Sequence, residues 1–185
     1  MVIGASPKLE GWQCLPFPLD DKDLPALLLD RIELLQDESV DLFFWAEGFE
    51  TVNFETATNL IRQIRQKLHQ DGVLILCVND LSSMLWKIFT QNYRYSDSVS
   101  NVSGLFGKTH ASGSIIPLRF AYTEPLLVDL VISAGFKNYR TLSTARHKHQ
   151  VNTLNGLGLT SFESDFNCPT VRDHHKLFAI ASRTV

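Results

Sequence analysis

The segment that decides the fold runs from Val40 to Asp80 and reads VDLFFWAEGFETVNFETATNLIRQIRQKLHQDGVLILCVND. Two short apolar runs, Val40 to Trp45 and Val73 to Val78, predict buried strands. The residues between them predict a loop, an amphipathic helix and a tight turn. A strand, a helix and a strand in this order predict one β-α-β unit. Its polar groups gather at the carboxyl ends of the strands, where open α/β sheets bind their ligands.

The helix of this unit is expected over Phe54 to His69. Asn53 suits the position before its first turn, where a side-chain oxygen accepts from unpaired backbone N–H groups. Glu55 suits the positive end of the helix dipole, and Asp71 followed by Gly72 is typical of a turn. Apolar residues recur at helical spacing along one side of the helix, namely Leu60, Ile61, Ile64 and Leu68.

The N-terminal part of the chain predicts weaker elements. Val2 and Ile3 are expected to form a very short first strand. The run from Trp12 to Leu19 carries two prolines, which cannot donate to a β-ladder, so an edge strand or an extended segment is expected there. Asp20 to Leu29 is expected to hold a short helix with Pro25 in its first turn.

Beyond the β-α-β unit, the pattern predicts two more helices and two more strands. Leu81 to Phe89 predicts a helix, and Tyr93 to Ser114 predicts a long irregular connection that is either functional or mobile. An amphipathic helix is expected over Glu124 to Ala134, with Gly135 ending it. The closing elements are a strand near Tyr139 to Leu142, a hairpin connection at Asp165 to Asp173 and a strand at Lys176 to Ser182.

Alternating strands and helices predict a Rossmann-like α/β fold, with a mostly parallel central sheet and helices on both of its faces. The two final strands predict a C-terminal antiparallel hairpin, which the edge of a mixed sheet accommodates. The 185 residues are enough for one domain with a substantial core. Because no repeat or boundary interrupts the pattern, a single domain over residues 1–185 is expected.

The composition narrows the function classes. Hydrophobic content of 44% and charged content of 20% are typical of a soluble globular protein. A net charge of −3 gives no general basic field, so nucleic-acid binding is not favoured. Cys14, Cys77 and Cys168 stand far apart, which suits a reducing compartment. With no long apolar run and no basic-then-apolar leader, we expect a cytoplasmic location and no membrane contact.

Four histidines in the last part of the chain suggest a test for a metal site. His147 and His149 would lie on one side of a strand, while His174 and His175 are adjacent in sequence. No carboxylate or cysteine completes a ligand set around them. Surface histidines are therefore expected, and no metal.

Several segments, in order, resemble class I S-adenosylmethionine-dependent methyltransferases, and among them the small bacterial proteins called predicted methyltransferases. IGASPKLEGW (residues 3–12) resembles the opening glycine loop of the family. LLQDESVDLFFWAEGFETV (residues 34–52) resembles its strand and the following loop that ends in Glu-His. LIRQIRQKLHQDGVLILCVNDL (residues 60–81) resembles its helix, Pro-Gly-Gly turn and next strand. EPLLVDLVISAGF (residues 124–136) and DHHKLFAIAS (residues 173–182) resemble its late helix and last strand.

The resemblance implies S-adenosylmethionine as the cofactor. The family's ribose-binding acid falls at Pro16 in this chain, which leaves Asp20 as the nearest candidate. Asp30 falls where the family has an acid that contacts the adenine. Glu47 lies just past a strand end, where the cofactor or substrate is expected. Close backbone approach at the first turn, which small residues permit, is assigned to Gly4, Ala5 and Ser6.

Methyl transfer needs mainly the alignment of nucleophile, methyl group and sulfur, and some acceptors also need a general base. His110, within the Gly- and Ser-rich connection, is the candidate base. Asp80, at the end of the second strand, is a further polar candidate. The acceptor is unknown, and it is either a substrate or a protein partner.

Each candidate also has a structural explanation. Gly4 suits an ordinary strand-to-loop turn, Asp30 a solvated surface and His110 a loop without a partner. The loop keeps one glycine where the family usually has two or three. The alternative function is therefore a non-catalytic methyltransferase-like module for binding or assembly that has lost cofactor binding. A third hypothesis is that a longer chain supplies residues ahead of Met1.

Overall fold

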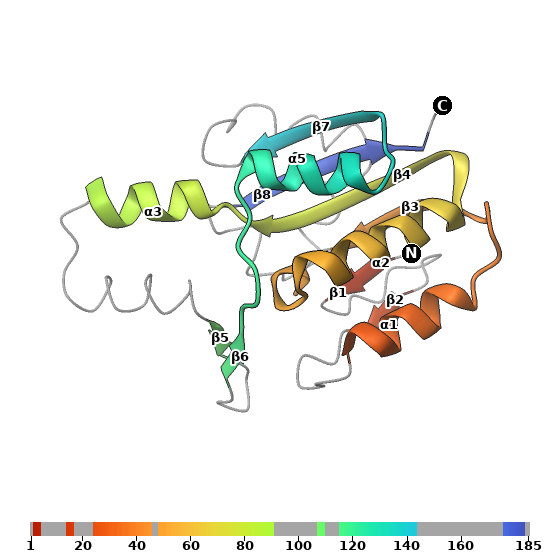
Figure 1. Cartoon of the computed structure of the whole chain (residues 1–185), viewed down its shortest axis with the longest axis horizontal. Coiled ribbons are helices and arrows are strands. Elements are labelled where there is room, and N and C mark those ends of the chain that lie inside the picture. Colours follow the sequence, from red (N-terminus) through yellow and green to blue (C-terminus); the bar gives the residue numbers. More distant parts are fainter. Residues whose placement is uncertain are drawn as a thin grey trace.

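The computed structural model describes residues 2–4, 14–16, 24–45, 48–90, 107–109, 115–143 and 176–183. Its central feature is a six-stranded sheet with the order β2-β1-β3-β4-β8-β7, and a second, two-stranded sheet pairs β5 with β6 (Figure 1). The strands are β1 (Val2–Gly4), β2 (Cys14–Pro16), β3 (Val40–Trp45), β4 (Leu68–Asn79), β5 (Gly107–Thr109), β6 (Ile115–Pro117), β7 (Asn138–Ser143) and β8 (Lys176–Ser182). The helices are α1 (Leu24–Glu33), η1 (Phe49–Thr51), α2 (Phe54–Lys67), α3 (Leu81–Thr90) and α5 (Glu124–Ser133).

The large sheet is mixed, which corrects the prediction of a mostly parallel one. Strands β2, β1, β3 and β4 pair in parallel. Strand β8 then pairs antiparallel with β4 on one side and with β7 on the other. The predicted antiparallel pairing of the two final strands is confirmed. The sequence pattern missed that β8 enters between β7 and the parallel strands, because burial periodicity does not name a strand's neighbours.

Helices α1, α2 and α5 lie side by side on one face of the large sheet, with α2 in the middle (Figure 1). They cover alternate residues of the strands, among them Phe43, Trp45, Leu74 and Leu76, all of which are fully buried. The intervening residues point to the other face and are also buried, as Ile75 is. Helices were predicted on both faces of the sheet. In the part of the chain that the structure describes, α1, α2 and α5 all cover one face.

Helix α2 begins as predicted. The side chain of Asn53 accepts a hydrogen bond from the backbone N–H of Thr56 across 2.8 Å, which caps the first turn. The helix ends at Lys67, two residues before the predicted His69. Leu68 already pairs with Val40 of the neighbouring strand. The chain therefore joins the sheet at Leu68 and does not continue the helix to His69.

The predicted turn at Asp71 and Gly72 takes another form, because both residues lie inside β4. Val40 pairs with Leu68 and Leu42 pairs with Val73, so four residues of β4 stand opposite one residue of β3. The backbone is tightly folded within this bulge. A Cβ atom on Gly72 would lie 2.9 Å from the backbone N and O of His69 and from the backbone O of Val40.

Strand β2 and helices α1 and α5 are found close to where they were predicted. Strand β2 lies at the sheet edge, as Pro16 at its end indicates. Helix α1 carries Pro25 in its first turn but runs four residues further than predicted. Helix α5 ends before Gly135, whose φ of +94° suits glycine. The predicted connection at Asp165 to Asp173 lies outside the described residues. No helix in the described ranges is long and apolar enough to span a membrane.

Candidate functional site

The sheet has a topological switch point between β1 and β3. Strand β1 pairs with β2 on one side and with β3 on the other, and all three run parallel. The chain leaves β1 towards β2 and later returns on the opposite side as β3. Open α/β sheets bind ligands outside the carboxyl ends of strands at such a point. Ile3 pairs with Trp45 here, so Gly4 and Trp45, which end their strands, lie at the same edge of the sheet.

The structure places two of the sequence-predicted cofactor residues. Gly4 ends β1 at the switch point, in register with Pro16 at the end of β2. Asp30 is exposed on the outer part of α1, the seventh of its ten residues. Helix α1 leads away from the carboxyl edge of the parallel strands (Figure 1), and Asp30 lies in its second half. The remaining predicted site residues lie outside the described ranges, namely Ala5, Ser6, Asp20, Glu47 and His110.

Asp80 is buried, with 1% of its surface exposed, and its carboxylate is engaged by neighbours. One oxygen accepts from the backbone N–H of Ser83 across 3.2 Å, in the first turn of α3. The other accepts from the hydroxyl of Ser143, at the end of β7, across 2.8 Å. The backbone N–H of Leu81 also donates to the carbonyl of Tyr122. Asp80 therefore holds α3 and β7 to the end of β4, which is a positioning role.

Glu50 is a buried carboxylate that was not among the residues predicted from the sequence, whereas Glu47 was. It lies in η1, a single turn that begins after Gly48, and Gly48 has a left-handed φ of 79°. Only 2% of the Glu50 surface is exposed. Its Oε1 accepts from the backbone N–H of Asn79 across 2.7 Å. Its backbone carbonyl accepts from the N–H groups of Arg119 and Phe120 across 2.9 and 3.0 Å.

These contacts make Glu50 the junction of three segments: the turn after β3, the end of β4 and the stretch that precedes α5. A signal for it was present in the sequence. Glu50 and Thr51 stand at the position of the Glu-His pair in the resemblance described above. Distance from the strand end favoured Glu47, whereas the left-handed turn at Gly48 is what carries Glu50 back over the sheet edge.

The second carboxylate oxygen of Glu50, Oε2, is buried and has no hydrogen-bond partner among the described residues. The hydroxyl of Tyr122 is buried in the same condition. Burial raises the pKa of the Tyr122 phenol well above its ordinary value, and the nearby charge of Glu50 raises this pKa further. Unpaired buried polar atoms are rare in folded proteins, so each one needs an explanation.

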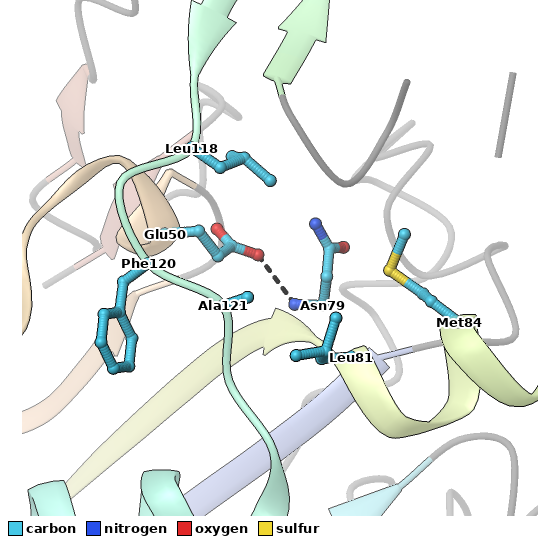
Figure 2. Close-up of a pocket in the computed structure, with 7 residues that line it drawn as sticks. All are labelled: Glu50, Asn79, Leu81, Met84, Leu118, Phe120 and Ala121. Atoms are coloured by element: carbon cyan, nitrogen blue, oxygen red, sulfur yellow. Dashed lines mark hydrogen bonds between the residues drawn. The ribbon is translucent and has the colours of Figure 1, made fainter. Parts of the chain in front are cut away.

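A small open hollow lies beside Glu50 and encloses about 240 Å³, part of it open to solvent. Figure 2 shows Glu50 and Asn79 facing each other across it, with Leu118 above and Met84 opposite Glu50. Lys176, which is 3% exposed, donates to Oδ1 of Asn79 and so fixes the amide. The lining residues are Glu50, Asn79, Leu81, Met84, Leu118, Phe120 and Ala121, of which five are apolar.

In the described ranges, no group of three or more His, Cys, Asp or Glu side chains could hold a metal ion. The four histidines named above lie outside these ranges. The candidate site has two parts, both at strand ends of the large sheet. One is the switch point at Gly4, and the other is the hollow at Glu50 and Asn79.

Comparison with known proteins gives no sequence match. No protein-family model matches the chain, and no curated protein does. Solved structures do match. A SAM-dependent methyltransferase from Archaeoglobus fulgidus aligns over 98% of this chain and 84% of its own, with 9% identity and a TM-score of 0.52.

The chain has a class I methyltransferase-like fold. A second match, named as a possible exported protein from Bordetella parapertussis, covers all of this chain and 62% of its own, at 15% identity and a TM-score of 0.52. The chain spans 32% of human N-acetylserotonin methyltransferase, at 11% identity and a TM-score of 0.45. Identities this low concern the fold alone.

Proposed function

We propose that the chain is a methyltransferase that binds S-adenosylmethionine at the switch point between β1 and β3 and transfers its methyl group to an acceptor. The observation that carries the proposal is the position of Gly4. It is the last residue of β1, at the edge where the chain continues beyond Trp45. A glycine there lets the backbone approach a ligand closely, and ligands of such sheets bind at this edge.

The residues at this edge fit the cofactor in part. Gly4 supplies the close turn, with Ala5 and Ser6 proposed to continue it. Strand β2 ends in Pro16, which offers no carboxylate to the ribose hydroxyls. We assign that role to Asp20, four residues further along the chain. Glu47, two residues beyond Trp45, is proposed to bind the cofactor at the same edge.

S-adenosylmethionine supplies a methyl group on a positively charged sulfur. The protein's part is to bind and orient the two reactants, because alignment provides much of the rate in such reactions. For an acceptor that must lose a proton, we propose that a ring nitrogen of His110 accepts it. Asp30, exposed on α1, is proposed as the acid that contacts the adenine.

The test is isothermal titration of the purified protein with S-adenosylhomocysteine, the product of methyl transfer. Saturable binding is expected for the parent chain. Gly4→Arg should abolish it, because a long charged side chain would fill the close approach, and Glu47→Ala should weaken it. Glu55→Ala is the matched control, since Glu55 is an exposed acid on α2. Asp30→Ala tests the adenine role separately.

Absence of binding in folded protein would overturn the proposal. It would favour the alternative, a methyltransferase-like module that acts in binding or assembly without the cofactor. The single glycine of the first turn is the feature that points to this alternative. The next experiment would then be a search for a protein partner.

A further inference from the structure

We propose that the hollow beside Glu50 binds an organic ammonium ion, a primary or secondary amine in its charged form on an apolar body. The proposal concerns binding alone and does not require the chain to bind S-adenosylmethionine. It also deepens the proposed function, because under that function the ammonium-bearing molecule is the methyl acceptor, and in that respect it rests on it.

Glu50 has one carboxylate oxygen that accepts no hydrogen bond within the described part of the chain. Glu50 is 2% exposed, and its Oε1 is occupied by the backbone N–H of Asn79. Its Oε2 has no partner within the described part of the chain. A buried polar atom left without a hydrogen bond is costly, and more so when it belongs to a charged group. A ligand that donates to Oε2 would remove this cost.

The charge of Glu50 has no ion-pair partner within the described ranges. Among the described residues, no basic side chain forms an ion pair with Glu50. The buried Lys176 donates to the side chain of Asn79. Arg119 contributes its backbone N–H to the Glu50 carbonyl, while its side chain is exposed. A cation from outside the chain would complete the pair.

The lining of the hollow is mostly apolar. Leu81, Met84 and Leu118 surround the opening that Glu50 and Asn79 face (Figure 2). Apolar walls favour an apolar body and offer no second charge. They exclude a strongly hydrated metal ion, which needs several oxygen ligands. An anion would be repelled by Glu50, and a neutral alcohol would donate a hydrogen bond but leave the charge uncompensated.

The Glu50 carboxylate is held in one orientation by its hydrogen bonds. Glu50 is fixed at its carboxylate by Asn79 and at its carbonyl by Arg119 and Phe120. The side chain therefore cannot swing towards water without losing the bond to Asn79. A group held in its binding orientation before the ligand arrives loses little freedom on binding.

The experiment uses n-butylammonium as the probe, with 1-butanol and butyrate as neutral and anionic counterparts of the same length. Binding is followed by two-dimensional NMR at pH 7 on isotope-labelled protein. The backbone amide of Asn79 is the local reporter, since it donates to the carboxylate in question. Saturable shifts of Asn79 and Phe120 are expected with butylammonium, and neither counterpart should produce them at the same concentration.

Two variants separate the site from general charge attraction. Glu50→Gln should weaken butylammonium binding by about tenfold or more, as expected for the loss of a charge-assisted bond. Glu55→Gln removes an exposed acid of α2 and should leave binding unchanged. Met84→Trp leaves Glu50 in place and fills the hollow, so it too should abolish binding, and it serves if Glu50→Gln fails to fold.

Three results would overturn the proposal. Butanol could bind as well as butylammonium, both glutamate variants could lose affinity equally, or Met84→Trp could bind as the parent does. Titration with S-adenosylhomocysteine is run in parallel on the same samples. Loss of one binding event with retention of the other shows which of the two proposals has failed.

Discussion

Oε1 of Glu50 accepts a hydrogen bond from the backbone N–H of Asn79 across 2.7 Å, which joins the turn after β3 to the end of β4. These residues are 29 positions apart in the chain. Through its backbone carbonyl, the same glutamate also holds the segment before α5. One residue thus joins the turn after β3, the end of β4 and the segment before α5.

The first prediction separates the hydrogen bond of Glu50 from its charge. Glu50→Ala leaves the half-buried N–H of Asn79 without its acceptor, so it should lower the free energy of unfolding by about 1–3 kcal/mol. Glu50→Gln keeps an amide oxygen for that N–H and removes a buried charge that forms no ion pair within the described residues, so it should cost less or even stabilise. Urea denaturation of the three proteins measures the difference. Equal destabilisation by both variants would show that the charge itself holds the segments.

Two of the buried strands were predicted closely from the sequence. Val40–Trp45 and Lys176–Ser182 are found with the predicted bounds. Their residues are apolar along short continuous runs, and burial on both faces of the sheet explains that pattern. Leu68 suits both the end of α2 and the start of β4. The predicted end of the helix was therefore wrong by about one half-turn.

The candidate site was predicted less well, for a physical reason. Burial of Glu50 follows from the left-handed turn at Gly48 and from contacts with residues far along the chain. Neither has a local periodicity. Asp80 looked similar in sequence, yet its carboxylate is engaged by Ser83 and Ser143. Two acids at neighbouring strand ends therefore differ in availability, which only the tertiary structure decides.

A second prediction concerns the start of α2. Asn53→Ala removes the side-chain oxygen that accepts from the N–H of Thr56, and it should lower the free energy of unfolding by about 1 kcal/mol. Asn53→Asp keeps an acceptor at the same place and is the matched control, which should remain within a few tenths of a kcal/mol of the parent. Thermal unfolding followed by circular dichroism distinguishes them, and a parent-like melting curve for Asn53→Ala would contradict the cap.

A third prediction compares two glycines. Gly72→Ala would place a Cβ atom 2.9 Å from backbone atoms of His69 and Val40, which cannot yield without disturbing the pairing of β3 with β4. Gly135→Ala would meet the Arg65 side chain at an ordinary 3.7 Å, and its cost is the strain of a positive φ, about 1–2 kcal/mol. Gly72→Ala should therefore be the more destabilising of the two in urea denaturation. The reverse order would show that the bulge in β4 adapts easily.

The last prediction concerns Tyr122. Its hydroxyl is buried with no partner among the described residues, so Tyr122→Phe should retain or raise stability at neutral pH. Burial, and then the charge of Glu50, raise the pKa of Tyr122 in the folded protein. Above a pH of about 10, the unfolded chain releases this phenolic proton while the folded protein keeps it. The folded state then binds more protons, so the free energy of unfolding falls as pH rises.

Tyr122→Phe removes this contribution, and its advantage over the parent protein should therefore grow as pH rises above about 10. Urea denaturation of both proteins at a series of alkaline pH values measures the two slopes. Ultraviolet titration of the folded proteins gives an independent check. The variant lacks the Tyr122 phenol, whose proton the parent protein is expected to release only on unfolding. Parallel stability curves would mean that Tyr122 ionises as readily in the folded protein as in the unfolded chain, and that its hydroxyl reaches water.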